Sequence, residues 1–443
     1  MNRLRIQQVW EVLWRAAIVI LPWQTRWFSD RQLAGWAWEQ GRISVYGSWF
    51  VLAAAIVCGF ALSVCERLSA GVTSSAKRFR FRQLSHTTQL IIVFIGWIFC
   101  TSILAAHFST NALRPVLQWW SQIFLLVGFV WLVHRRAVPW VSVASWFVIA
   151  VIPHAVLGVI QAIMQKVVGG SWFGMASQLP AQLGVSVIEQ GSLRWLRAYG
   201  GFPHPNIFGG WLALAVLVAC MLVVAARTKK QAVWWTVCAA LCSVALLLTY
   251  SRGAWIATAV GALAYVAARY VMQKDRSLFL RVVLGCVIVT TCVVGYAQRS
   301  LIFTRTATST RLEARSVNER VASLQNGWKV FREHTLFGTG PNVELLRLAE
   351  HEPLSRSIAP LEPPHNFFLL MLADIGVVGV VLVAYLAYLC VRSLRRQSIT
   401  PERVSIIATL FVLALFDHYL WSLWAGQSLL ALGVLLMGKR VHG

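Results

Sequence analysis

Apolar runs of about twenty residues recur along the whole chain, and each is long enough to cross the hydrocarbon core of a bilayer as one helix. Of the 443 residues, 58% are hydrophobic and only 13% are charged, whereas a soluble domain has about 25% charged residues. Within lipid, a crossing segment must satisfy its own backbone hydrogen bonds, which a helix does internally. The sequence therefore predicts an all-α polytopic membrane protein, with residues 1–443 forming a single integral membrane domain.

Twelve apolar runs are expected to form the membrane-spanning helices. The first run is short and carries Glu11 and Arg15, and the others hold few charges. Two polar segments, 161–205 and 297–365, are too long to be turns and are expected to be large external loops. The expected spans are 9–23, 45–65, 90–108, 116–133, 138–160, 206–226, 232–248, 254–272, 278–296, 366–391, 404–420 and 424–437.

The distribution of basic residues predicts the orientation of these spans. The connectors after the second, fourth, sixth, eighth and tenth spans are rich in Lys and Arg, which favours a cytoplasmic location for them. Both termini then lie in the cytoplasm, including Arg3, Arg5, Lys439 and Arg440. The loops 161–205 and 297–365 fall on the external face.

Several classes of function are disfavoured by composition and by missing motifs. The formal net charge is +24, but the basic residues are scattered between apolar runs rather than gathered in one stripe, so nucleic acid is not an expected partner. The nine cysteines lie in or beside apolar runs without a CxxC pair, which is typical of small buried hydrophobes. No P-loop and no H-E-x-x-H motif is present. We expect no metal and no cofactor.

The external loop 297–365 contains an amphipathic pattern. Its apolar residues recur at steps of four, three, four and three, which predicts one face of a helix. This helix is expected to lie on the membrane surface or to cap the bundle, with Arg320 beside the stripe. The stripe consists of Val317, Val321, Leu324, Trp328 and Phe331.

Several cationic side chains are expected on the external face, although the positive-inside rule favours such residues in cytoplasmic connectors. Each arginine alone is explained by contact with lipid headgroups, but several together predict a site for phosphate or pyrophosphate, because guanidinium groups bind phosphate in a bidentate manner. His365 and Asn366 follow two prolines at the start of an apolar run, where a helix offers free N–H groups. The candidates are Arg194, Arg197, His204, Arg252, Arg320, His365, Asn366 and Asp417.

Four segments of the chain resemble motifs of the O-antigen ligase and polymerase superfamily. They are Arg-Ala-Tyr-Gly-Gly-Phe-Pro-His-Pro-Asn at 197–206, Thr-Tyr-Ser-Arg-Gly at 249–253, the segment from Arg320 to Gly340, and His365-Asn366 followed after nine residues by Gly-x-x-Gly at 376–379. The resemblance covers about 190–391, which we expect to be an O-antigen ligase-like core. Each motif alone is weak, but their order and shared external location favour this family.

The resemblance implies a fold of the GT-C kind and a metal-independent, inverting glycosyltransferase. The implied donor is a glycan on undecaprenyl pyrophosphate, and the implied location is the bacterial inner membrane with the site on the periplasmic face. By matched position, Arg197, Arg252 and Arg320 would hold the pyrophosphate and His365 would be the general base. Asp417 matches a late outer acid of some ligases and is expected either to orient His365 or to pair with an arginine.

The acceptor is left open by the resemblance. An O-antigen ligase transfers the glycan to lipid A–core, a polymerase to another lipid-linked repeat, and a protein O-oligosaccharyltransferase to Ser or Thr of a protein. The resemblance of 365–379 to the signature of the ligases favours the ligase. A solute or bicarbonate transporter is an alternative of a different class, but the sequence shows no inverted repeat of the transporter kind, and the large external loop favours an enzyme.

Overall fold

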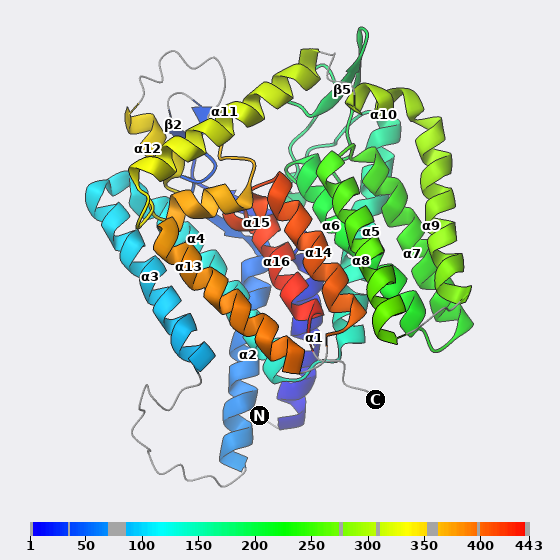
Figure 1. Cartoon of the computed structure of the whole chain (residues 1–443). Helices are drawn as coiled ribbons and strands as arrows, with labels where there is room; N and C mark the ends of the chain where they lie inside the picture. The colour runs from blue at the N-terminus through cyan, green and yellow to red at the C-terminus, as the bar shows by residue number, and fades with distance from the viewer. Residues whose placement is uncertain are drawn as a thin grey trace.

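The fold was obtained as a computed structural model, which describes residues 3–33, 36–69, 86–273, 278–306, 311–351, 362–396 and 399–438. It is mostly helical, with long helices in one bundle and α11 lying across one end of it (Figure 1). Parts of the basic connectors fall in 70–85 and 274–277, and Lys439 and Arg440 follow residue 438, so these expectations lie outside the described residues.

Each of the twelve apolar runs corresponds to a helix. By length and composition, seven helices within the described ranges can cross a membrane, namely α2, α4, α5, α6, α7, α8 and α13. The multi-pass character is thereby confirmed, whereas the number twelve stays a prediction. The helices are α1 (Arg3–Ile20), α2 (Gly47–Ser69), α3 (His86–Phe108), α4 (Leu113–Arg135), α5 (Trp140–Met164), α6 (Pro205–Ala225), α7 (Lys229–Leu248), α8 (Arg252–Gln273), α9 (Leu278–Ala297), α13 (Phe367–Arg396), α14 (Pro401–Phe416) and α16 (Trp424–Leu436).

The segment between α1 and α2 and the segment between α5 and α6 contain short strands, which the all-α prediction omitted. They form three two-stranded antiparallel pairs. The other helices of the described residues are α10 (Arg299–Thr306), α11 (Arg311–Glu333), α12 (Glu344–His351) and α15 (Tyr419–Ser422), and single 3-10 turns lie at Thr110–Ala112 and Ser171–Phe173. The pairs are β1 (Arg26–Phe28) with β4 (Ser44–Tyr46), β2 (Gln32–Leu33) with β3 (Trp36–Ala37), and β5 (Val187–Gln190) with β6 (Leu193–Leu196).

Helix α6 forms the centre of the bundle. In the apolar stretch of this helix, 94% of the residues are buried, as expected for a helix that is hydrophobic on all sides. Two glycines near its start permit close packing: a Cβ at Gly209 would lie 2.9 Å from Ala254 of α8, and one at Gly210 would lie 2.2 Å from the Tyr419 hydroxyl of α15. The start of α6 is therefore held against both α8 and α15.

Helix α11 confirms the predicted helix, and the face that it packs against the protein shares only Phe331 with the apolar stripe. Val330 and Phe331 are buried, whereas Val321 and Trp328 of the predicted stripe are 47% and 51% exposed. On the packed face, Gly327 lies against Pro364 and Leu369, where a Cβ would lie 2.8 Å from the proline ring. Most of the apolar stripe therefore lies away from this contact.

Helix α13 is interrupted at Gly376, whose backbone has φ +66° and ψ −179°. This conformation is essentially restricted to glycine. The interruption frees backbone groups, so Val377 N–H donates to Thr335 O at 2.9 Å and Gly340 N–H donates to Asp374 O at 2.9 Å. Backbone hydrogen bonds on both sides of Gly376 thereby join the segment that follows α11 to α13.

We expect Gly376→Ala to destabilise the protein more than Gly96→Ala in α3. A Cβ at Gly376 would lie 2.3 Å from Leu336 O, whereas one at Gly96 meets nothing within 4 Å, and the backbone strain alone costs about 1–3 kcal/mol. Thermal denaturation of the two variants in detergent measures the difference. Equal melting temperatures would contradict this role of Gly376.

Candidate active site

Arg197 lies in the segment between β6 and α6 and is buried. Its Nε donates to Thr249 O at 2.7 Å, and its Nη2 donates to Asn206 Oδ1 at 2.7 Å. The turn that follows has positive φ at Gly200 (+59°) and Gly201 (+92°), which only glycine adopts without strain. Arg197 is thus fixed against the ends of two helices, α6 and α7.

The Gln161 side chain of α5 holds the same turn from the other side. Its Oε1 accepts the N–H groups of Tyr199 at 3.1 Å and of Gly200 at 2.8 Å. The His154 ring of the same helix contacts Gly200 O. Residues of α5 that the sequence did not mark as functional therefore support the position of Arg197.

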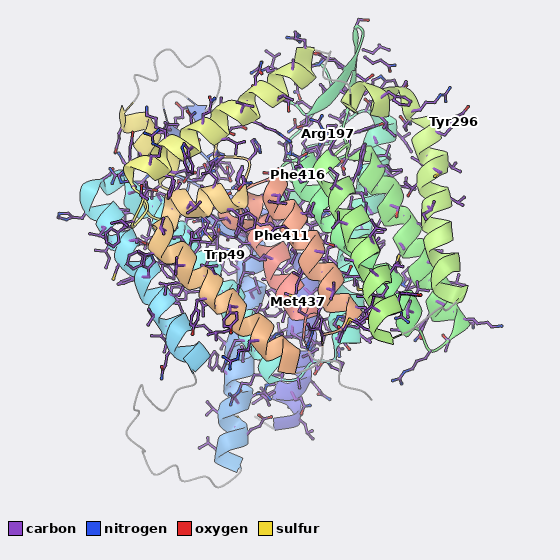
Figure 2. The ribbon with its side chains drawn as sticks, in the orientation of Figure 1. Trp49, Arg197, Tyr296, Phe411, Phe416 and Met437 are labelled. Atoms are coloured by element: carbon purple, nitrogen blue, oxygen red, sulfur yellow. The ribbon has the colours of Figure 1, made fainter. Side chains whose placement is uncertain are left out.

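Arg252 and Arg320 meet in a small cavity although they come from different parts of the chain. Arg252 begins α8, directly after a turn in which Tyr250 has φ +49°. Arg320 comes from α11 and lines the same cavity, together with Asn206 and Asp417. Figure 2 places Arg197 and Phe416, which also lines the cavity, near the end of the bundle below α11, with Met437 toward the other end.

His365 lies between two carboxylates. Its Nδ1 is 3.4 Å from Asp417 Oδ1, and its Nε2 is 3.1 Å from Glu362 Oε2. Asp417 Oδ2 accepts a hydrogen bond of 3.2 Å from Asn206 Nδ2. Since Asn206 also accepts from Arg197, an unbroken chain of polar contacts leads from Arg197 through Asn206 and Asp417 to His365.

The charges in this cluster shift its ionisation. Burial alone would lower the pKa of His365, but hydrogen bonds and charge from Asp417 and Glu362 outweigh burial and raise this pKa to about 9. Burial would raise the pKa of the Asp417 carboxyl, but the hydrogen bond and charge of His365 hold it well below its usual range. Two other histidines stay neutral, because burial lowers the pKa of His418 to about 4 and that of His204 to about 3. At neutral pH, His365 is therefore a histidinium between two carboxylates.

Two of the predicted candidates have other partners. Arg194 lies on β6, where its Nε is 3.8 Å from Glu189 and its Nη1 donates to Ala181 O at 3.2 Å. His204 is the N-cap of α6 and accepts from Asn206 N–H at 3.1 Å, while its Nε2 lies 3.0 Å from Ser186 Oγ. Arg194 thus contacts the β5–β6 hairpin and the backbone of Ala181, and His204 contacts the start of α6 and Ser186.

Asn366 caps α13 and ties it to α14. Its Oδ1 accepts from Leu369 N–H at 2.9 Å, and its Nδ2 donates to Leu415 O at 3.1 Å. Asn366 therefore fixes the helix start beside His365 through hydrogen bonds to the backbone of two helices.

Sequence reasoning missed three residues of the cluster. Glu362 precedes His365 by three residues, and this closeness in sequence offered only a weak signal. Asn206 ends a recognised motif, and His418 follows Asp417, but neither was given a role. His365, Asp417 and His418 each place one potential metal-ligand atom within 4.8 Å of the others. All three also have protein contacts, including His418 Nδ1 with Ser422 Oγ at 2.6 Å.

The fold and this cluster define a multi-pass membrane protein with a cationic cavity and a histidine–carboxylate pair at one end of its bundle. Residues 237–384 match the family model described as O-Antigen ligase. This match supports the resemblance to the O-antigen ligase superfamily that the motifs indicated, and the matched segment contains Arg252, Arg320 and His365. This family consists of membrane glycosyltransferase-like enzymes. No match was found among curated proteins or among solved structures.

We expect Arg252→Ala to lower glycan transfer by about 10²–10³-fold, the usual loss on removing one group that stabilises developing negative charge. Arg194→Ala, which removes the same charge from the same face, is expected to stay within about twofold, because Arg194 faces Glu189 on the β5–β6 hairpin. Transfer by the purified variants measures both. Equal losses would mean that net charge, rather than the cavity, decides activity.

Proposed function

We propose that this protein is a glycosyltransferase of the bacterial inner membrane that transfers a glycan from undecaprenyl pyrophosphate to a hydroxyl group, with lipid A–core as the acceptor. On this proposal it is an O-antigen ligase. The carrying observation is that Arg252, Arg320 and Asp417 line one cavity, and that Asp417 also contacts His365. The cations proposed to bind the leaving pyrophosphate are therefore linked through Asp417 to His365, the base proposed for the attacking hydroxyl.

The proposed reaction is one displacement at the anomeric carbon of the donor sugar. The acceptor oxygen forms the new bond to this carbon as the bond to the phosphate oxygen breaks, and the pyrophosphate leaves with the electron pair. Attack opposite the leaving group inverts the configuration. Arg252 and Arg320 neutralise the charge that grows on the pyrophosphate, with Arg197 held beside them through Asn206. Since pyrophosphate is already a good leaving group, the step needs neither ATP nor a metal.

His365 is proposed to take the proton of the acceptor hydroxyl through Nε2, because Nδ1 faces the buried Asp417. Asp417 would orient the ring and stabilise the histidinium that forms, as a carboxylate does in other catalytic histidine pairs. Nε2 contacts Glu362, which is 54% exposed. The acceptor hydroxyl must therefore displace the Glu362 carboxylate before it can reach the base.

Replacing the base tests the enzymatic proposal. We expect His365→Ala to lower transfer by about 10²–10⁴-fold, the usual contribution of a general base, and to cause the lipid-linked donor to accumulate. His134→Ala in the last turn of α4 is the control and should behave as the wild type. The proposal fails if His365→Ala leaves both the surface glycan and the donor pool unchanged.

The pH profile separates the roles of the two carboxylates. The base form of His365 exists above its pKa of about 9, so kcat/KM of the wild type should rise with pH up to that value. Both carboxylates raise this pKa, so Glu362→Gln and Asp417→Asn should each move the rise to lower pH. Glu362→Gln should keep the plateau rate, whereas Asp417→Asn should lower it, because the histidinium loses its buried partner. An unmoved profile in Glu362→Gln would contradict the proposed contact.

The lipopolysaccharide of a strain lacking the gene identifies the acceptor. We expect core without O-antigen, because a ligase makes the bond between core and glycan. Core that carries a single repeat would instead indicate a polymerase, and an unglycosylated protein with intact lipopolysaccharide would indicate protein O-glycosylation. Gel electrophoresis of lipopolysaccharide followed by mass spectrometry distinguishes these products.

A further inference from the structure

A second cavity lies at the end of the bundle opposite His365. Helix α6 begins beside the candidate active site and has 21 residues, which at 1.5 Å per residue puts its other end about 30 Å away. There the start of α5, the end of α6 and the start of α7 surround a groove of about 720 Å³. Neither the catalytic proposal nor the family motifs involve this groove.

The groove has an apolar wall and a cationic mouth. Val141, Leu222 and Ala225 form part of its wall, and Arg227 and Lys230 lie at the mouth. Both cations are exposed, and among the described residues that line the groove none is acidic. Such a surface is complementary to a molecule with one anionic head and an apolar tail.

The position of the groove matches the headgroup level of a bilayer. Trp234 and Trp235 line it one turn into α7, and Trp234 is 52% exposed. Tryptophan is enriched at this level because its ring is apolar and its N–H is polar. The first turn of α7, capped by Thr228, adds the positive end of a helix dipole at the same mouth.

We propose that this groove binds an anionic phospholipid of the adjoining leaflet, with its phosphate between Arg227 and Lys230 and an acyl chain along Val141 and Leu222. A free phosphate would leave the apolar wall exposed. A transmembrane helix of a partner would bury two cations for which the groove supplies no carboxylate. A phospholipid satisfies both parts of the surface.

Binding of this kind has a consequence for the bundle. The lipid would contact α5, α6 and α7 together, and it would bind the folded bundle but not the unfolded chain. It must therefore stabilise the protein by mass action. Because the site is far from His365, this stabilisation is independent of the proposed glycosyltransferase activity.

The test uses the full-length protein in mixed micelles with either phosphatidylglycerol or phosphatidylcholine. Thermal unfolding and native mass spectrometry report stabilisation and retained lipid. We expect phosphatidylglycerol to raise the melting temperature and to stay bound to the wild type. The double variant Arg227→Gln/Lys230→Gln should bind it about tenfold more weakly, since each juxtamembrane cation contributes to attraction for anionic lipid.

The matched control is Arg135→Gln/Lys229→Gln, which removes two exposed cations that do not line the groove. It should retain the response of the wild type. The proposal is overturned if phosphatidylglycerol and phosphatidylcholine act alike on the wild type, or if the two double variants lose the response equally. Stabilisation by glycerol phosphate alone would also overturn it, because that result would mark a phosphate site without a lipid.

Discussion

The side-chain amide of Asn206 holds two charges of opposite sign in fixed positions, and the candidate active site depends on this contact. Its oxygen accepts from Arg197 at 2.7 Å and its nitrogen donates to Asp417 at 3.2 Å. Buried charges are tolerated only when they are paired or hydrogen-bonded, so the amide lets the cation and the carboxylate coexist at the start of α6. The close packing of Gly209 and Gly210 brings α8 and α15 to the same point.

The arrangement around this amide separates the two tasks of the proposed glycan transfer. Arg252 and Arg320 present positive charge to a cavity, whereas His365 faces carboxylates on both ring nitrogens. The same carboxylates that make His365 a strong base also keep it protonated before substrate arrives. Displacement of Glu362 by the acceptor would lower the pKa of His365. Acceptor binding and activation of the base would then both depend on the contacts of one atom, Nε2.

The sequence predicted the positions of the long helices, but it did not predict several contacts between side chains. The helix at α14 ends at Phe416 rather than at residue 420, because the backbone of Asp417 is extended and points its carboxylate toward His365. The apolar stripe of α11 located the helix, whereas the close approach of Gly327 to Pro364 and the burial of Val330 could be seen only in the packing. Arg194 was a possible site residue by its place among the external cations, yet the β5–β6 hairpin turns it toward Glu189.

The sequence by itself determined the membrane class, the position of the long helices and the resemblance to the O-antigen ligase family. These properties depend on local hydrophobicity, on backbone hydrogen bonds that lipid cannot satisfy, and on short motifs. Only the tertiary structure decided which charged residues meet, that Asp417 and Glu362 flank His365, and that the pKa of His365 rises to about 9. The physical reason is that burial and charge pairing act over a few ångströms in space, between side chains that the chain order keeps far apart.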